Sequence, residues 1–462
     1  MKFWSWPPIL LLIVLAGCGL PRVEKGATCR AVEARLPVPQ PPYSTLPISR
    51  RVIRFTQPVE RELYVTTRNV PFVRNLLDSL AVRTRAKPGR PYHVLALSAG
   101  GQVGAYGAGV VAGWKYNARN PPPTFDLVTG ISTGALLAPL VFLGEDQTAK
   151  RLYTTIASDD IYRPRSGLEL LFANSLTDTA PLREKVQGIV TDDFVARIAA
   201  EGQKGRVLAI QAVDLDAGES VVFDLTAIAQ RKNFPVCARM SPRECIINAL
   251  LAASAMPVAF PPVFIDSEMY VDGGLRQHGF TINLINGALH SPTATARSLD
   301  NPEGFALRLP STPDPEAASV NLTLIANTDL EYPLTCTGNG LREIAERAAV
   351  IMIDQLAVGS FFRLLAETQS HPGSSAKFTY ADPALTQCEL GQSDAESLTG
   401  TFKPEYMRCL YRAGCSLAAT GAELWHTQPT DLPHSPIARH PASAANLRRL
   451  TLNAPAICLV GE

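Results

Sequence analysis

The sequence predicts an α/β fold with a mostly parallel central sheet and helices on both faces. Short apolar runs rich in β-branched residues alternate with longer stretches of helical composition, which is typical of strands buried on both faces. At residues 92–114 and 125–138, such a run passes through glycines directly into a helix-forming stretch. With 462 residues, 46% of them hydrophobic, the chain can bury a large core.

The first expected strand, residues 92–98, leads into a glycine-rich loop, Gly100-Gly101-Gln102-Val103-Gly104, and then into a helix. Such a loop points the unpaired N–H groups of a helix start at an anion, and glycine lets a ligand oxygen approach the backbone. No Lys-Ser/Thr follows Gly104, which excludes a Walker-type phosphate loop. The same loop matches part of the glycine pattern of dinucleotide-binding sites.

The second expected strand, residues 125–129, runs into Gly130-Ile131-Ser132-Thr133-Gly134 and a further helix. This G-x-S-x-G turn has the pattern of a nucleophile elbow, which exposes the serine while Gly130 and Gly134 let strand and helix pack closely. Ser132 is therefore the predicted nucleophile. Beside an elbow, the upstream loop is best interpreted as an oxyanion hole. Its candidate donors are Gly100, Gly101, Gln102 and Gly104.

The alternation of strand and helix continues along the chain. Strands are expected at residues 206–210, 220–223 and 320–326, and helices at 341–369 (one long or two) and 404–421. Asp214 and Asp216 lie in an expected solvated turn, which we prefer to a metal site. The aromatic and methionine stripe of 404–421 (Tyr406, Met407, Leu410, Tyr411) is expected to pack in the core. The proline-rich residues 302–315 are expected to form an irregular surface insertion.

A third motif, Asp272-Gly273-Gly274, follows the elbow at a distance. In this order, the glycine loop, the serine elbow and the D-G-G motif resemble the patatin-like phospholipase family. Residues 249–257, followed by Phe260-Pro261-Pro262, are also similar to that family. The resemblance implies a patatin-like three-layer fold with the nucleophile elbow above the sheet.

The same resemblance implies a serine–aspartate dyad acting on fatty-acyl esters of phospholipids or lysophospholipids, without a cofactor. Asp272 would take the proton of Ser132, which would form an acyl-enzyme, and burial would have to raise the basicity of Asp272. The family usually carries Arg or Lys at the position of Val103, so a charge is missing from the loop here.

Three alternatives remain open. An α/β-hydrolase triad would need a histidine after Asp272, and His278 is the nearest of six candidates, with His290, His371, His426, His434 and His440. A catalytically idle lipoprotein acting as a lipid-binding or envelope-interaction module is favoured only by Val103. A soluble-ester or thioester hydrolase would share the site and differ in its pocket.

The amino terminus predicts export and lipidation. Met1-Lys2 precedes the apolar run Ile9–Ala16, which is too short to span a bilayer, and Leu15-Ala16-Gly17-Cys18 resembles a bacterial lipobox. Residues 1–17 would be the signal peptide, and Cys18 would anchor the chain in the membrane. Gly19 resembles the sorting signal of outer-membrane lipoproteins. We expect a proline-rich tether over 18–50, a catalytic core over 51–290, and the rest of the same domain over 291–462.

Cysteine usage and charge agree with an exported enzyme. Eight cysteines besides Cys18 suggest disulfides, and Cys237 and Cys245 could close a short loop. Cys409 and Cys415 would lie on different faces of one helix and need separate partners. No C-x-x-C occurs and no histidine has ligand spacing, so we expect no metal site. A net charge of +1 without a basic patch argues against nucleic acid. The sequence leaves the oligomeric state undetermined.

Overall fold

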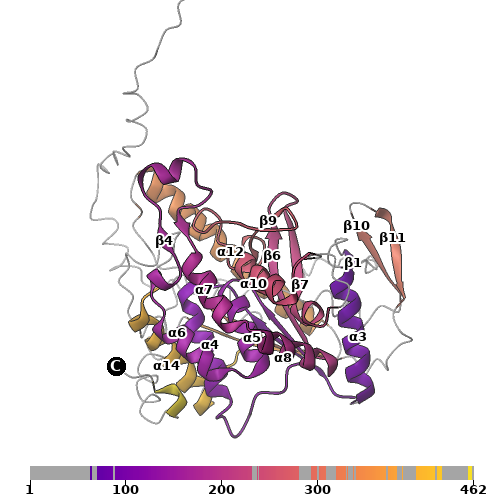
Figure 1. Ribbon diagram of the computed structural model, residues 1–462. Helices are drawn as coiled ribbons and strands as arrows, with labels where there is room; N and C mark the ends of the chain where they lie inside the picture. The colour runs from indigo at the N-terminus through magenta and orange to yellow at the C-terminus, as the bar shows by residue number, and fades with distance from the viewer. Residues whose placement is uncertain are drawn as a thin grey trace, which may run out of the picture.

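An eight-stranded, mostly parallel sheet forms the centre of the computed structural model (Figure 1), which confirms the predicted α/β class. The structure describes residues 63–64, 70–86, 89–231, 237, 239–279, 293–298, 301–308, 319–328, 330, 337, 340–370, 373–381, 388, 402–421, 424–428 and 456–459. Cys18 and the expected tether lie outside these residues.

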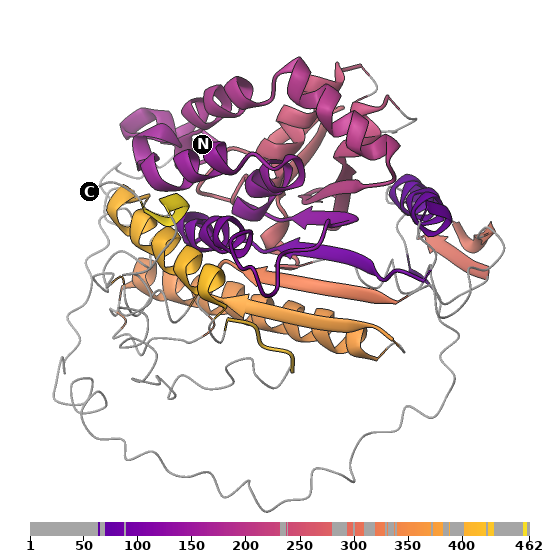
Figure 2. The same cartoon turned by 90° about the horizontal axis from the view of Figure 1, so that it is seen from below.

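The strand order explains how distant parts of the chain meet. It runs β13 (Ser375–Tyr380), β12 (Val320–Ala326), β2 (Tyr92–Leu97), β3 (Leu127–Gly130), β6 (Val207–Asp214), β9 (Glu268–Asp272) and β8 (Val263–Ile265), and β7 (Glu219–Asp224) also pairs with β6. The strands from β13 to β6 are parallel, whereas β7 and β9 run antiparallel to β6. Figure 2 shows the orange strands of the carboxy-terminal half beside the violet strands of the amino-terminal half.

Alternating strand residues build a hydrophobic core on each face of the sheet. In β2, Val94 and Ala96 join the core covered by α3 (Val70–Ala86) and α12 (Leu341–Gln369). Leu95 and Leu97 join the larger core on the other face. This alternation is the period of a strand buried on both sides.

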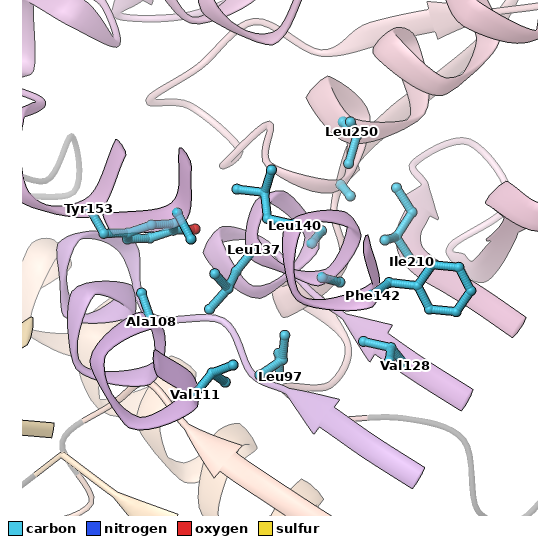
Figure 3. Packing of buried hydrophobic residues seen from close by; sticks show 14 of the residues in the cluster. Leu97, Ala108, Val111, Val128, Leu137, Leu140, Phe142, Tyr153, Ile210 and Leu250 are labelled. Carbon is cyan, nitrogen blue, oxygen red and sulfur yellow. The ribbon is translucent and has the colours of Figure 1, made fainter. Parts of the chain in front are cut away.

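The helices of the larger core surround the elbow. They are α4 (Gly104–Trp114), α5 (Thr133–Leu143), α6 (Asp146–Thr155), α7 (Ala180–Ile189), α8 (Asp192–Gln203), α9 (Leu225–Ala229), α10 (Pro242–Ala253) and α14 (Pro404–Thr420). Figure 3 shows Leu97 and Val128 of the sheet below Leu137 and Leu140 of α5. The close packing of α5 on the strands fixes the position of its first residues, where the elbow lies.

The helix α12 is long and apolar enough to cross a membrane by length and composition alone. Its carboxy-terminal half packs on the sheet, where Phe361, Leu364 and Leu365 are buried. This packing favours a helix that covers the sheet. It also settles the expectation for residues 341–369, since they form one helix.

The expectation of an irregular insertion at 302–315 was wrong in its first half. Residues Asn301–Arg308 form β11, which pairs antiparallel with β10 (Thr293–Ser298), and β1 (Leu63–Tyr64) joins them in a small second sheet. Pro302 is tolerated because β11 is an edge strand, where a missing N–H costs no ladder bond. Residues 309–318 lie outside the described part.

The disulfides and one turn can be compared with the expectations from the sequence. Cys237 is bonded to Cys245, as predicted. Cys409 and Cys415 have separate partners, Cys388 and Cys458, which was also predicted. The Asp214 carboxylate accepts the N–H groups of Asp216 and Ala217, which confirms the turn. Asp214 itself is buried at the end of β6, so the expectation that it is solvated was wrong. Cys29 and Cys336 lie outside the described residues.

Candidate active site

The strand-to-helix turn at Ser132 has the strained geometry of an elbow. Ser132 adopts φ 53° and ψ −125°, a positive φ that non-glycine residues rarely take, between β3 and α5. A Cβ added at Gly130 would lie 2.2 Å from the Gly134 carbonyl oxygen, and one at Gly134 would lie 2.4 Å from the Leu97 carbonyl oxygen. Both positions therefore need glycine for close backbone approach, as the G-x-S-x-G pattern predicted.

The topology of β6 brings Asp272 to this serine. β3 runs parallel to β6 and ends with Gly130 opposite Ile210, whereas β9 runs antiparallel and ends with Asp272 opposite Ala212. β7 pairs with both Ile210 and Ala212, so it occupies the other edge of β6. β3 and β9 thus share one edge and meet with their carboxyl ends facing each other. The two predicted site residues, distant in sequence, come together there.

The Ser132 hydroxyl and the Asp272 carboxylate are hydrogen-bonded. The Gly274 N–H donates to Asp272 Oδ1 at 2.7 Å, so the D-G-G turn orients the carboxylate. Asp272 is 3% exposed, and this burial raises the pKa of its carboxyl to about 6 although both hydrogen bonds oppose the shift. A carboxylate of this basicity can accept a serine proton more readily than an exposed one.

The loop after α10 ties the nucleophile to the carboxylate. The Ser132 N–H donates to the Ala253 carbonyl at 3.0 Å, and the Asp272 N–H donates to the Ala255 carbonyl at 2.9 Å. Between them, the Ser254 hydroxyl lies 3.3 Å from the Ser132 carbonyl oxygen. The family resemblance had pointed to this segment, but these contacts depend on tertiary structure and have no local sequence signal.

The glycine loop lies on a buried polar support. Gly100 has φ 157°, and a Cβ added there would lie 1.4 Å from the Asn327 carbonyl oxygen, whereas Gly101 faces open space. The Gly104 N–H donates to the carbonyls of Gly101 and Gln102 within the turn. A Cβ at Gly104 would lie 2.2 Å from Thr133 Oγ1, so this glycine packs the loop against the elbow. The Gly104 N–H is thus used within the turn, contrary to the expectation that it is an oxyanion donor, and Gly100, Gly101 and Gln102 are the remaining candidate donors.

Asn327 is a site residue that the sequence analysis missed. It follows β12, is fully buried, and its backbone N–H donates to Ser98 Oγ at 2.7 Å. Its side-chain Nδ2 donates to the Ser98 carbonyl at 3.0 Å. These two bonds hold the end of β2, from which the glycine loop begins. A polar residue directly after the apolar run 320–326 was the available signal.

An apolar pocket of about 670 Å³, its open mouth included, extends from the glycine loop and the elbow. Its lining comes from the loop, α5, α6, α7, α8, α10 and the start of α14: Gly101, Thr133, Leu136, Pro139, Leu140, Leu152, Tyr153, Ile156, Ile161, Leu182, Lys185, Val186, Ile189, Val190, Phe194, Leu250, Phe402 and Met407. The expected core packing of Tyr406, Met407, Leu410 and Tyr411 is confirmed, and Met407 also lines the pocket.

One wall of the pocket is hydrogen-bonded to the glycine loop. The Lys403 N–H donates to Gln102 Oε1 at 3.2 Å, and the Phe402 N–H donates to Ser158 Oγ at 2.9 Å. Val103, where the family usually has a cation, packs against the larger core. The Gln102 side chain therefore links the loop to the pocket wall, while its backbone stays in the loop.

His278 is buried close to the D-G-G turn but does not complete a triad. Neither of its ring nitrogens is hydrogen-bonded to Ser132 or Asp272; the ring lies beside the Gly274 backbone and meets Phe361 edge-on. Burial lowers its pKa to about 4, so the imidazole is neutral. Among the described residues, no group of three His, Cys, Asp or Glu side chains could hold a metal ion.

Residues 95–282 match the model of patatin-like phospholipases, and they contain the glycine loop, the elbow and the D-G-G turn. Over this segment, the chain is therefore similar to patatin-like phospholipases. Over 190 residues, the chain is 32% identical to a cGAMP-activated phospholipase of Pseudomonas aeruginosa (strain BWHPSA011 / Pa011). The match covers 40% of this chain and 53% of that protein, so the chain spans about half the length of this relative.

Among solved structures, VipD from Legionella pneumophila is similar at 10% identity and a TM-score of 0.30. That match covers 73% of this chain and 68% of VipD. The similarity to patatin-like phospholipases is shown by the family match and not by this structure. The α/β class is shown by the order and direction of the strands.

Proposed function

We propose that this chain is a serine acyl hydrolase that cleaves fatty-acyl esters of phospholipids or lysophospholipids through a Ser132–Asp272 dyad. The observation that carries the proposal is the hydrogen bond between these two side chains, at an elbow that opens on an apolar pocket. The pocket wall begins at Gly101 and Thr133, next to both the oxyanion loop and the nucleophile. An acyl chain lying in this pocket would have its ester carbonyl beside Ser132.

The reaction would proceed in two steps. Asp272 takes the proton of Ser132 as Oγ attacks the carbonyl carbon, and the N–H groups of Gly100, Gly101 and Gln102 stabilise the oxyanion. Collapse breaks the ester bond, and the leaving alcohol takes the proton from Asp272. Water then gives a proton to Asp272 and attacks the acyl-serine, which releases the fatty acid and returns the proton to Ser132.

Labelling with a fluorophosphonate tests the dyad directly, because the probe reacts with an activated serine. We expect labelling of the wild type and of His278→Ala, and none of Ser132→Ala or Asp272→Ala, with folding checked by thermal melting. Loss of labelling in a folded His278→Ala variant would move the mechanism to a triad. An unlabelled wild type would instead favour an idle lipid-binding module.

We also propose that the enzyme is an exported lipoprotein, anchored through Cys18 and sorted to the outer membrane. The lipobox-like sequence before Cys18 supports the anchor. The three disulfides support an oxidising compartment, since such bonds are rare in the cytosol. An anchor of two or three acyl chains would keep the catalytic domain at a membrane surface.

A further inference from the structure

A hairpin with an exposed apolar tip projects from the body of the molecule. Its strands are β4 (Arg163–Pro164) and β5 (Thr177–Asp178), and between them lies the short helix η6 (Gly167–Leu171). Phe172 is 92% exposed and Leu168 is 76% exposed, beside the partly exposed Leu170. Figure 1 shows this loop standing out above the label β4. Large apolar side chains clustered at such exposure usually mark an interaction surface.

The hairpin grows out of the wall of the acyl pocket. Ile161, just before it, and Leu182, just after it, both line the pocket, and the Leu182 N–H donates to the Ile161 carbonyl at 3.3 Å. The chain therefore leaves the pocket wall, forms the apolar tip, and returns to the same wall. A partner held by the tip would lie next to the pocket.

The hairpin is also joined to the loop that holds the dyad. The N–H groups of Leu176 and Thr177 donate to the carbonyls of Val258 and Ala259 at 2.8 and 3.1 Å. Residues 253–255 of that same loop bind the backbones of Ser132 and Asp272. Val258 is 60% exposed and Leu176 is 39% exposed, so two further apolar side chains are exposed at this junction.

The charges around the tip suit a phospholipid surface. Arg163, at the base of the hairpin, is exposed, and Arg165 beside it is half-buried. The carboxylate of Glu169 is turned back toward the Ser166 N–H, at 3.5 Å. Arginines behind an apolar tip can bind phosphate headgroups while the tip enters the acyl region.

We propose that this hairpin docks the enzyme on the lipid leaflet that contains its substrate, with Leu168, Leu170 and Phe172 inserted among the acyl chains. The role given to this contact rests on the proposed phospholipid hydrolase activity, but the contact with the membrane does not depend on catalysis. Insertion would place the pocket wall at the leaflet, so that an acyl chain could pass from lipid to pocket without crossing water.

Local quenching tests the contact even in a chain that is anchored elsewhere. Phe172→Trp and the control Phe362→Trp, the latter 47% exposed on α12, are made in the full chain carrying Ser132→Ala. Vesicles contain phosphatidylglycerol and phosphatidylcholine brominated on its acyl chains. We expect the fluorescence added by Trp at 172 to fall by about half or more, and that added at 362 to persist. Quenching at neither position, or equally at both, would overturn the proposal.

Activity provides the second test, in the chain with Ser132 intact. The Leu168→Ser/Phe172→Ser double variant should hydrolyse phospholipid vesicles about tenfold more slowly but retain wild-type turnover of soluble p-nitrophenyl butyrate. Phe362→Ser should match the wild type on both substrates. Equal vesicle rates for the double variant and the wild type would contradict docking. A wild type inactive on both substrates would refute the proposed function, and the quenching result would still decide the contact.

Discussion

Replacing Asp272 by asparagine should abolish activity and yet stabilise the folded protein at neutral pH. Burial raises the pKa of Asp272 from 3.8 to about 6. The folded state therefore holds this proton more tightly than the unfolded state. The stability that comes from the protonated carboxyl is present at acid pH and is lost as the pH rises through about 6.

The magnitude follows from the shift. Two pKa units correspond to about 3 kcal/mol between the protonated and charged forms. Asparagine cannot ionise, so Asp272→Asn avoids the cost of the buried charge. The difference in unfolding free energy between the variant and the wild type should grow by about 2 kcal/mol from pH 4 to pH 8, because the unfolded carboxyl is already more than half ionised at pH 4.

Urea unfolding of both proteins at the two pH values measures this difference, with disulfides intact. Other titrating groups are common to both chains and cancel. A stability difference that does not change with pH would refute the claim that Asp272 is buried and charged at neutral pH.

In the wild type, kcat/KM for p-nitrophenyl butyrate should fall about tenfold per pH unit below the Asp272 pKa, because a protonated base cannot accept the serine proton. Activity at pH 5 equal to that at pH 8 would exclude Asp272 as the base.

Three further predictions concern the loop, the pocket and the anchor. Gly100→Ala should lower kcat at least about 100-fold, because its Cβ would meet the Asn327 carbonyl and displace the oxyanion donors; wild-type kcat would refute this role. Phe402→Ala should enlarge the pocket and shift preference in a series of p-nitrophenyl esters toward longer acyl chains; an unchanged profile would show that Phe402 does not limit chain length. Cys18→Ser should leave activity in detergent micelles intact and release the protein from membranes in cell fractionation; continued retention would disprove the lipid anchor.

The local elements of the site could be predicted from the sequence because they depend on residues adjacent in the chain. A glycine-flanked serine between an apolar strand and a helix former specifies a tight turn by itself, and Ser132 adopts that turn with φ 53°. The glycine loop likewise follows β2 as expected. The second half of β6 and the strand β11 were missed, since pairing with neighbouring strands extends or creates strands that local composition does not indicate.

The α/β class, the elbow and the glycine loop could be predicted from the amino-acid sequence alone, and the family resemblance pointed to Asp272. The burial of Asp272 and its hydrogen bond to Ser132 depend on the tertiary structure, because the two residues meet only where two strands share one edge of β6. The support of the loop by Asn327 and the lining of the pocket by Phe402 and Met407 depend on it as well. These contacts join segments far apart in the chain. The packing and burial that stabilise these contacts form only when the whole chain is folded, so a short stretch of sequence does not reveal them.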